Sequence, residues 1–325
     1  MNIEEHGEFM EQRQKKYIMR LLLLLTISLL LVISGCSGDG TSGQYEKVYT
    51  GEEGIVLTFL PDSPKNVYTQ DESINLQIEV SNNGRYDYPE GAVFIDGFDK
   101  QAVFFSSTKK QLPPLNGKSL SNPKGDVVFL QFEESQGVKV PYGDSYKAVL
   151  QATSCYHYQT YATTNACIIP DINDINKGKT TCSPQTKKLQ TQAAPVAVTQ
   201  VEERITRDLV QFIITIENIG DGRIISFDKL HKCPYELEPK EVDIVYLTAQ
   251  IDTLGEADCG ENIVQLFNKK GVIICKFITR PEISSYETLL QITLDYGYSS
   301  VIKKDIQFIN PAFTGEEIDE QAKTI

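Results

Sequence analysis

The residues in this chain that come closest to a catalytic arrangement are Cys155 and His157. A thiol beside an imidazole can act as a nucleophile with its base, and such a pair also needs a third group that orients the base. The two residues lie two positions apart on a segment of alternating polarity, and no orienting group is recognisable near them. The whole chain holds 3 histidines and no tryptophan. We therefore expect no catalytic residue and a protein that is not an enzyme.

A second group of polar residues has the composition of a calcium-binding loop. Oxygen-bearing side chains occur at Asp171, Asn173, Asp174 and Asn176, and Gly178 follows them. Ca²⁺ prefers such ligands, but an EF-hand also requires a strict spacing and a bidentate acid, which this segment lacks. A solvated turn, in which Asp and Asn side chains bond to nearby backbone, fits the same residues better. We expect no metal site and no cofactor.

Cysteines form the third chemically informative set. The chain has 7 cysteines, and apart from Cys36 they all follow residue 150. Without Cys36 the chain has six cysteines and no Cys-x-x-Cys pair. An even number of this kind is typical of disulfides formed in an oxidising compartment, and the alternative is buried free thiols. The six are Cys155, Cys167, Cys182, Cys233, Cys259 and Cys275.

Two of the disulfides that we expect would close short loops. Cys167 and Cys182 would join a polar, turn-rich segment to the strand before it. Cys259 and Cys275 flank a segment that we interpret as a hairpin around residues 268–271. Six cysteines allow many connectivities, so these pairs are predictions from position alone.

Cys155 has two possible partners by its place on the strand. It lies on the polar side of an alternating segment, so its partner should lie outside the core. Both Cys182 and Cys233 satisfy that condition. If Cys182 joins its nearer neighbour, Cys155 is left with Cys233, and this bond would brace two parts of the chain.

The N-terminal segment contains a short apolar run behind a basic flank. Leu21–Ile33 is almost entirely apolar, and Arg20 precedes it. A run of this length is typical of a signal peptide and is short of the ~20 residues that span a bilayer. It ends at Ile33–Cys36, which reads Ile-Ser-Gly-Cys.

This ending resembles the lipobox of prokaryotic lipoproteins, in which an aliphatic residue stands three positions before the cysteine and small residues fill the gap. The resemblance implies a signal peptide over residues 1–35, cleavage before Cys36 and a lipid on its sulfur. It also implies a mature chain held at the extracytoplasmic face of the cell membrane. Residues 36–53 would form a flexible tether. The alternative is an uncleaved signal anchor.

The charge balance excludes one class of partner. The chain has 44 acidic and 31 basic residues, a net charge of −13. A nucleic-acid surface requires clustered Lys and Arg, so we expect no nucleic-acid partner. An acidic chain suits a domain displayed in a cation-rich exterior.

The sequence repeats itself at long range. Residues 145–158 reappear at residues 285–298, an offset of 140 with seven identities in fourteen positions. A second echo pairs Ile78–Gly84 with Thr215–Gly220, at a glycine-to-glycine offset of 136. Two landmarks in the same order at nearly the same offset predict tandem domains.

Alternation along these segments indicates strands. In residues 146–158 the even positions are mostly apolar or tyrosine and the odd positions are mostly polar, as in a strand with one buried face. Val149 and Leu289 break the pattern, and we expect both to lie beneath a loop. Similar short runs, bounded by Gly, Asn, Asp or Pro, recur through the rest of the chain.

An aromatic group surrounds the cysteine on the first of these segments. It consists of Tyr156, His157, Tyr158 and Tyr161. Exposed, these rings could bind a sugar or a peptide. Because two of the tyrosines recur in the second copy, shared core packing is the favoured interpretation.

These patterns together predict an all-β protein of two tandem immunoglobulin-like antiparallel β-sandwiches. An N-terminal helix carrying the signal and lipobox would precede the sandwiches. The first sandwich would occupy residues 54–170 and the second residues 194–311. A linker would span residues 171–193, and residues 312–325 would form an acidic disordered tail.

One resemblance gives this fold a family. The segment Ile78–Gly84 has the order aliphatic, Glu, aliphatic, any residue, Asn, any residue, Gly, and a strand led by Tyr146 follows. This combination resembles immunoglobulin-like domains of the CARDB type, which recur in prokaryotic and especially archaeal surface proteins. The resemblance implies a non-catalytic module for structure, adhesion or partner binding.

The expected partners are the membrane, through the lipid on Cys36, and another envelope protein or a surface polymer. Two alternatives stay open. The chain could be a ligand-binding lipoprotein for calcium, a glycan or a peptide. It could also be an accessory subunit held in the membrane by an uncleaved signal anchor.

Overall fold

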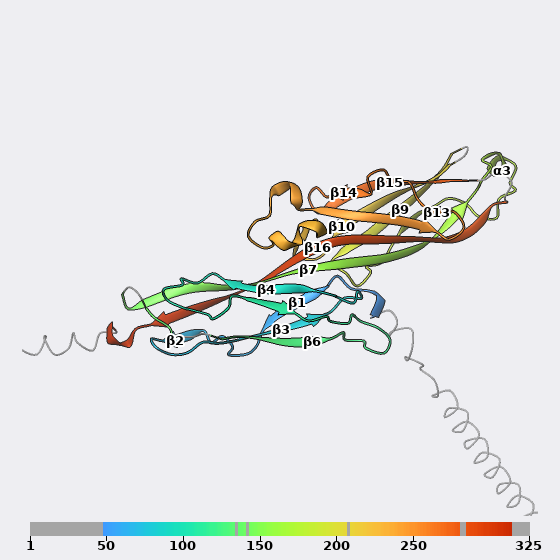
Figure 1. Cartoon of the computed structure of the whole chain (residues 1–325). Helices are drawn as coiled ribbons and strands as arrows, with labels where there is room; N and C mark the ends of the chain where they lie inside the picture. The colour runs from blue at the N-terminus through green and yellow to red at the C-terminus, as the bar shows by residue number, and fades with distance from the viewer. Residues whose placement is uncertain (1–47, 134–135, 141–142, 207–208, 280–283, 314–325) are drawn as a thin grey trace, which may run out of the picture. The chain divides into compact units, whose positions relative to one another are not determined.

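Short alternating runs become β-strands in most of the chain that the structure describes. The structure is a computed structural model, and it describes residues 48–133, 136–140, 143–206, 209–279 and 284–313 (Figure 1). In the strand β3 (Asn75–Asn82), for example, Leu76, Ile78 and Val80 are buried. Their neighbours Asn75, Gln77 and Glu79 face outward or are half-buried, because successive side chains of a strand point to opposite faces.

The described elements are mostly strands, joined by short turns and a few helical turns. The other strands are β1 (Ile55–Phe59), β2 (Val67–Thr69), β4 (Gly91–Asp96), β5 (Lys109–Leu112), β6 (Val127–Glu133), β7 (Ser145–Ile168), β8 (Thr186–Lys188), β9 (Val196–Ile205), β10 (Leu209–Asn218), β11 (Arg223–Ile225), β12 (Ile244–Ile251), β13 (Gly255–Glu256), β14 (Ile263–Gln265), β15 (Lys270–Ile278) and β16 (Tyr286–Ile309). The helical turns are α3 (Asn173–Asn176) and the 3₁₀ turns η1 (Phe227–Lys232), η2 (Pro239–Glu241) and η3 (Pro311–Phe313).

The strands form two small sheets and one large sheet. The small sheets have the orders β1-β3-β6 and β15-β10-β9-β8. The large sheet runs β13-β12-β16-β7-β4-β5, and β2, β11 and β14 pair at its sides. Pairing is antiparallel except between β2 and β16. The all-β antiparallel sandwich fold expected from the sequence is confirmed.

The centre of the large sheet is one long strand pair. β7 and β16 each have 24 residues and pair antiparallel along their whole length, from Tyr286 opposite Ile168 to Ile309 opposite Ser145. They lie side by side in Figure 1, β7 in green and β16 in red. β4 pairs with the first half of β7, and β12 pairs with the first half of β16. Residues 54–170 and 194–311 therefore share one sheet.

Four tyrosines lie at the middle of this pair. Tyr156 is opposite Tyr298 and Tyr158 is opposite Tyr296, with ring centroids 5.8 Å and 6.3 Å apart. All four side chains are buried. Core packing of Tyr156 and Tyr158, the favoured interpretation of the sequence, is confirmed.

Asn82, at the end of β3, is the hydrogen-bond partner of one of these tyrosines. The Tyr158 hydroxyl donates to Asn82 Oδ1 at 3.2 Å. Asn82 Nδ2 in turn donates to the Tyr86 carbonyl at 2.8 Å, closing the turn that follows the strand. A Cβ on Gly84 would lie 1.9 Å from the Tyr158 hydroxyl oxygen, so this position requires glycine.

The same contacts occur at the end of β10. The Tyr298 hydroxyl donates to Asn218 Oδ1 at 3.0 Å, and Asn218 Nδ2 donates to the Gly222 carbonyl at 2.9 Å. A Cβ on Gly220 would lie 2.5 Å from the Tyr298 hydroxyl oxygen. The Asn-x-Gly echo in the sequence thus marks two turns that are each held by a buried tyrosine.

Three local expectations differ from the structure. Val149 and Leu289 are 47% and 52% exposed instead of lying beneath a loop, because each stands on the outward face of its long strand. The turn at Asn268 and Lys269 is present, with positive φ at both residues. However, β14 pairs with β12 and β15 pairs with β10, so the expected hairpin opens into two sheets.

The segment expected as a linker, residues 171–193, is partly ordered into elements. It contains α3, and its strand β8 joins the four-stranded sheet beside β9. The predicted signal peptide and the lipidation residue Cys36 lie outside the described residues. So does most of the predicted acidic tail, from residue 314 onward.

Removing the tyrosine hydroxyls should test the two asparagine turns. We expect Tyr158→Phe and Tyr298→Phe each to lower the free energy of unfolding by about 1–2 kcal/mol, because each leaves a buried amide oxygen with one fewer donor. Urea denaturation followed by circular dichroism would measure the change. Tyr161→Phe is the matched control, since that ring is 41% exposed and its hydroxyl bonds to Gln159 at the surface. An equal loss in the control would contradict this account.

Candidate functional site

The connection between β11 and β12, residues 226–243, is the longest stretch of helical turns in the second half of the described chain. A disulfide joins its Cys233 to Cys155 on β7, across a sequence separation of 78. The two sulfurs are buried with Ile225 in a small apolar cluster separate from the main core, and Phe94 and Leu230 pack against it. Cys155 thus has its partner outside the sandwich core, as its strand position predicted.

The other four cysteines are also paired. Cys167 joins Cys182 and Cys259 joins Cys275, at separations of 15 and 16. These are the pairs that the sequence favoured. Because Cys155 is oxidised, it offers no thiolate to act as a nucleophile beside His157. Three disulfides are typical of proteins that function outside the cytoplasm.

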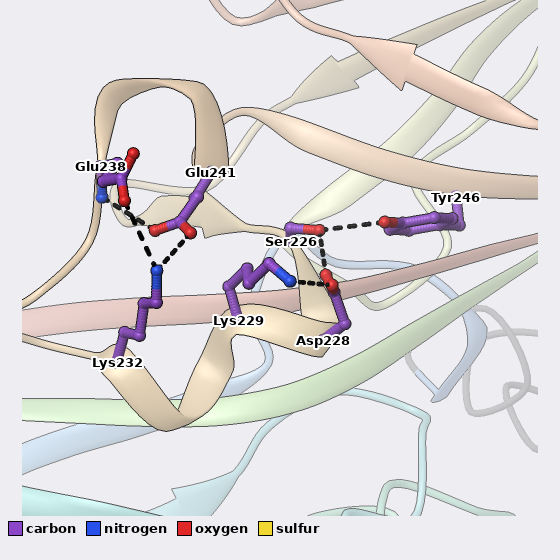
Figure 2. A network of polar contacts seen from close by, with 7 residues as sticks. All are labelled: Ser226, Asp228, Lys229, Lys232, Glu238, Glu241 and Tyr246. Atoms are coloured by element: carbon purple, nitrogen blue, oxygen red, sulfur yellow. Dashed lines mark hydrogen bonds and ion pairs between the residues drawn. The ribbon is translucent and has the colours of Figure 1, made fainter.

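One polar group fixes the start of the β11–β12 connection (Figure 2). Ser226 Oγ donates to Asp228 Oδ1 at 2.5 Å and lies 3.1 Å from the Tyr246 hydroxyl. Lys229 Nζ lies 2.6 Å from Asp228 Oδ2. The hydrogen bond from Lys229, together with that from Ser226, lowers the pKa of Asp228.

A second polar group fixes the end of the same connection. Glu241 is buried, and its carboxylate accepts the Glu238 backbone N–H at 2.9 Å and Lys232 Nζ at 2.5 Å, as Figure 2 shows. The backbone hydrogen bond from Glu238 and the contact with Lys232 lower the pKa of Glu241. A buried carboxylate with two donors is compensated for its lost hydration, so η1 and η2 are held in one arrangement.

The fixed connection forms one wall of a cavity of about 430 Å³. The opposite wall comes from β4 and β5, and the Cys155–Cys233 disulfide lies at its base. The side chains that face the cavity with polar or aromatic groups are Glu90, Phe94, Lys109, Gln111, His157, Phe227 and His231. The volume lies in the range of small-molecule sites, about 300–1,000 Å³.

His157 lies at the edge of the cavity and is held by β16. Its Nε2 lies 2.5 Å from Asp295 Oδ1, and Gln159 Nε2 donates to Asp295 Oδ2 at 2.7 Å. The Tyr161 hydroxyl donates to Gln159 Oε1 at 2.5 Å. The Asp295 carboxylate thus orients His157, but the sulfur that the histidine would have to activate is in a disulfide.

The calcium-like segment is a turn in the structure. Asp171 Oδ1 accepts the Asn173 backbone N–H at 2.9 Å and Asn173 Nδ2 at 2.8 Å. This carboxylate therefore closes an Asx turn just before α3, whose N-cap residue, Ile172, makes no side-chain cap hydrogen bond. Among the residues that the structure describes, no three His, Cys, Asp or Glu side chains are grouped to hold a metal ion.

One buried carboxylate lies away from the cavity. Glu203 on β9 is 8% exposed, and its Oε1 accepts the Cys167 backbone N–H at 2.9 Å. Burial raises the pKa of Glu203 to about 7. It joins β9 to β7 next to the Cys167–Cys182 disulfide, so its role is structural.

The cavity was not predicted from the sequence. Of the residues around it, the sequence indicated Cys155, Cys233 and His157. Phe227 and His231 stand in a mixed polar segment without periodicity, and nothing in that segment indicates that it covers β7. The expected disulfide between Cys155 and Cys233 was the one signal that connected this segment with β7.

No helix within the described residues has the length and hydropathy that crossing a membrane requires. No family model matches the chain, and no curated protein matches it. A similar solved structure is the crystal structure of the CupB6 tip adhesin from Pseudomonas aeruginosa. It has 9% sequence identity and a TM-score of 0.13, covering 81% of this chain and 97% of the adhesin chain. A TM-score this low supports no functional assignment.

The buried carboxylate predicts a pH dependence of stability. The folded pKa of Glu203, about 7, exceeds its ordinary value of 4.5, so its contribution is fully present below pH 4.5 and is lost as the pH rises through 7. We expect Glu203→Gln to raise the free energy of unfolding at pH 8 by up to about 3 kcal/mol relative to the native chain. At pH 4 the two should be nearly equal. Urea titrations at both pH values test this, and an equal difference at both would contradict it.

Removing the disulfide at the base of the cavity should destabilise the chain. With a separation of 78, loop-closure entropy predicts that replacing both Cys155 and Cys233 by Ala lowers the free energy of unfolding by about 4 kcal/mol. The matched control is the double replacement of Cys167 and Cys182, with an expected loss of about 3 kcal/mol for its shorter loop. Thermal unfolding by calorimetry would compare them. A Cys155/Cys233 variant as stable as the native chain would contradict the bracing role.

Proposed function

We propose that this chain is a lipid-anchored protein of the cell envelope that acts as a non-catalytic structural, adhesion or partner-binding module. The lipid would be carried by Cys36 after cleavage of residues 1–35. Residues 36–47 would form the tether between the membrane and the two sandwiches. The expected tether is shorter at its C-terminal end, because Val48 is buried and the Gly51 backbone N–H donates to Thr191 Oγ1 at 2.9 Å. This arrangement would place the described part of the chain outside the cytoplasm.

The observation that carries the non-catalytic proposal is the oxidised state of Cys155. The pair that could have formed a nucleophile and base is instead a disulfide beside a histidine held by Asp295. The other two disulfides support an oxidising location. The long β7–β16 pair supports a structural role, because it gives the displayed part a continuous central sheet.

Ligand binding is the second candidate function, and the cavity beside η1 favours it. A lipid-anchored module with a small-molecule site could recognise a surface polymer or a free ligand. This second function is compatible with the first.

The lipid anchor can be tested by metabolic labelling. We expect cells fed an alkynyl fatty acid to label the native chain but not Cys36→Ala, since only a thiol at this position can form the thioether. Detergent phase partition should move the variant from the detergent phase to the aqueous phase. Ser37→Ala is the matched control and should stay labelled. Labelling of Cys36→Ala, or a native chain that stays unlabelled in the cytosol, would overturn the proposal.

A further inference from the structure

The cavity between η1 and the β4–β5 pair is lined by side chains whose polar groups have no hydrogen-bond partner among the described residues. Glu90, Gln111 and His231 line this cavity and are exposed to solvent, and within the part of the chain that the structure describes they make no side-chain hydrogen bond or ion pair. A carboxylate, an amide and an imidazole together offer both donors and acceptors. Such a set suits a ligand with several hydroxyl groups.

The exposed aromatic ring of Phe227 lies on the η1 wall of the cavity. Phe227 is 41% exposed, and its ring packs edge-on against Tyr246, with centroids 4.8 Å apart at 71°. Because Tyr246 also bonds to Ser226, the ring position is set before any ligand arrives. An ordered, exposed ring offers a flat apolar face to the C–H groups of a sugar at little cost in side-chain entropy.

The opposite wall is equally ordered. Phe94 packs edge-on against Tyr235, with centroids 6.0 Å apart, and Lys109 Nζ lies 5.3 Å over the Phe94 ring. This wall carries one positive charge, from Lys109, and one negative charge, from Glu90. The cavity therefore does not favour a strongly charged ligand of either sign.

From these contacts we infer that the cavity is a binding site for a neutral carbohydrate, one or two sugar rings at the end of a glycan. Phe227 stacks on a ring face, and Gln111, Glu90 and His231 bond its hydroxyls. The inference deepens the proposed function, because it names the ligand class that a displayed adhesion module would recognise. A phosphate or carboxylate ligand would meet the carboxylate of Glu90 as well as the ammonium group of Lys109, so the lining gives it no net attraction.

Saturation-transfer NMR with neutral sugars tests the inference. The full chain, purified in a detergent without a sugar headgroup, would be mixed with glucose, galactose, mannose, N-acetylglucosamine and their common disaccharides. We expect signal transfer to at least one sugar, and calorimetry would then give its affinity. Phe227→Ala and Gln111→Ala should each weaken binding by roughly three- to tenfold, the loss expected for one ring or hydrogen-bond contact.

Phe267→Ala is the matched control, because Phe267 is a more exposed phenylalanine that lies away from the cavity, beside the turn at residues 268 and 269. It should bind as the native chain does. A second variant, Ala92→Leu, would fill the cavity from β4, and thermal unfolding would show that it stays folded. Loss of binding in this folded variant supports the site.

Three results would overturn the inference: no transfer to any sugar at millimolar concentration, equal binding by Phe227→Ala and Phe267→Ala, or binding to short peptides or inorganic phosphate in place of sugars. The lipid-labelling experiment measures acylation at Cys36 and does not depend on the cavity. Failure of sugar binding therefore leaves the anchored module intact, whereas failure of labelling leaves the sugar site to be judged by itself.

Discussion

The structure depends on the antiparallel pairing of β7 with β16. Over 24 residues these strands exchange backbone hydrogen bonds without an interruption in register. The four buried tyrosines lie near the middle of both strands. The buried tyrosine hydroxyls require hydrogen-bond partners nearby, because a buried hydroxyl without a partner costs free energy of folding. Tyr158 and Tyr298 meet this need through Asn82 and Asn218, which fix the ends of β3 and β10. Loss of the central pair would therefore deprive the ends of β3 and β10 of these two hydrogen bonds.

The strand pattern and the repeat were readable in the sequence because both follow from burial. Alternation at residues 146–158 reports which side of β7 faces the core, and the Asn-x-Gly echo reports the asparagine turns. The pairing of the two repeats with each other was not readable. Residues 159–168 are rich in Thr and Ala, so they carry a weak strand pattern, and their pairing partner lies more than 100 residues away. Sequence alternation identifies a face, but it does not identify the neighbouring strand.

The site was less predictable than the fold for a related reason. The lysines and acids of residues 226–243 have the composition of any exposed loop, and only their contacts distinguish them. Buried Glu241 accepts Lys232 because η1 and η2 fold back on each other, a geometry that local propensity does not encode. Cysteine spacing carried more information, since a covalent bond requires two distant positions to meet. It indicated that Cys233 reaches β7, but not that a cavity would open beside it.

The cavity arises where the two repeats differ at their shared centre. His157 and Gly297 occupy matching positions in the repeat and lie directly opposite each other in the β7–β16 pair. On the glycine side, a Cβ would lie 3.2 Å from Leu230 Cδ1 and 3.2 Å from the Ile225 carbonyl oxygen, so the absence of a side chain lets η1 approach the sheet. On the histidine side, the imidazole turns to Asp295 and borders the open space that η1 leaves against β4. A side chain at residue 297 would require Leu230 and Ile225 to shift by a few tenths of an ångström. The glycine at this position therefore allows the close contact of Leu230 and Ile225 with β16, beside the proposed sugar site.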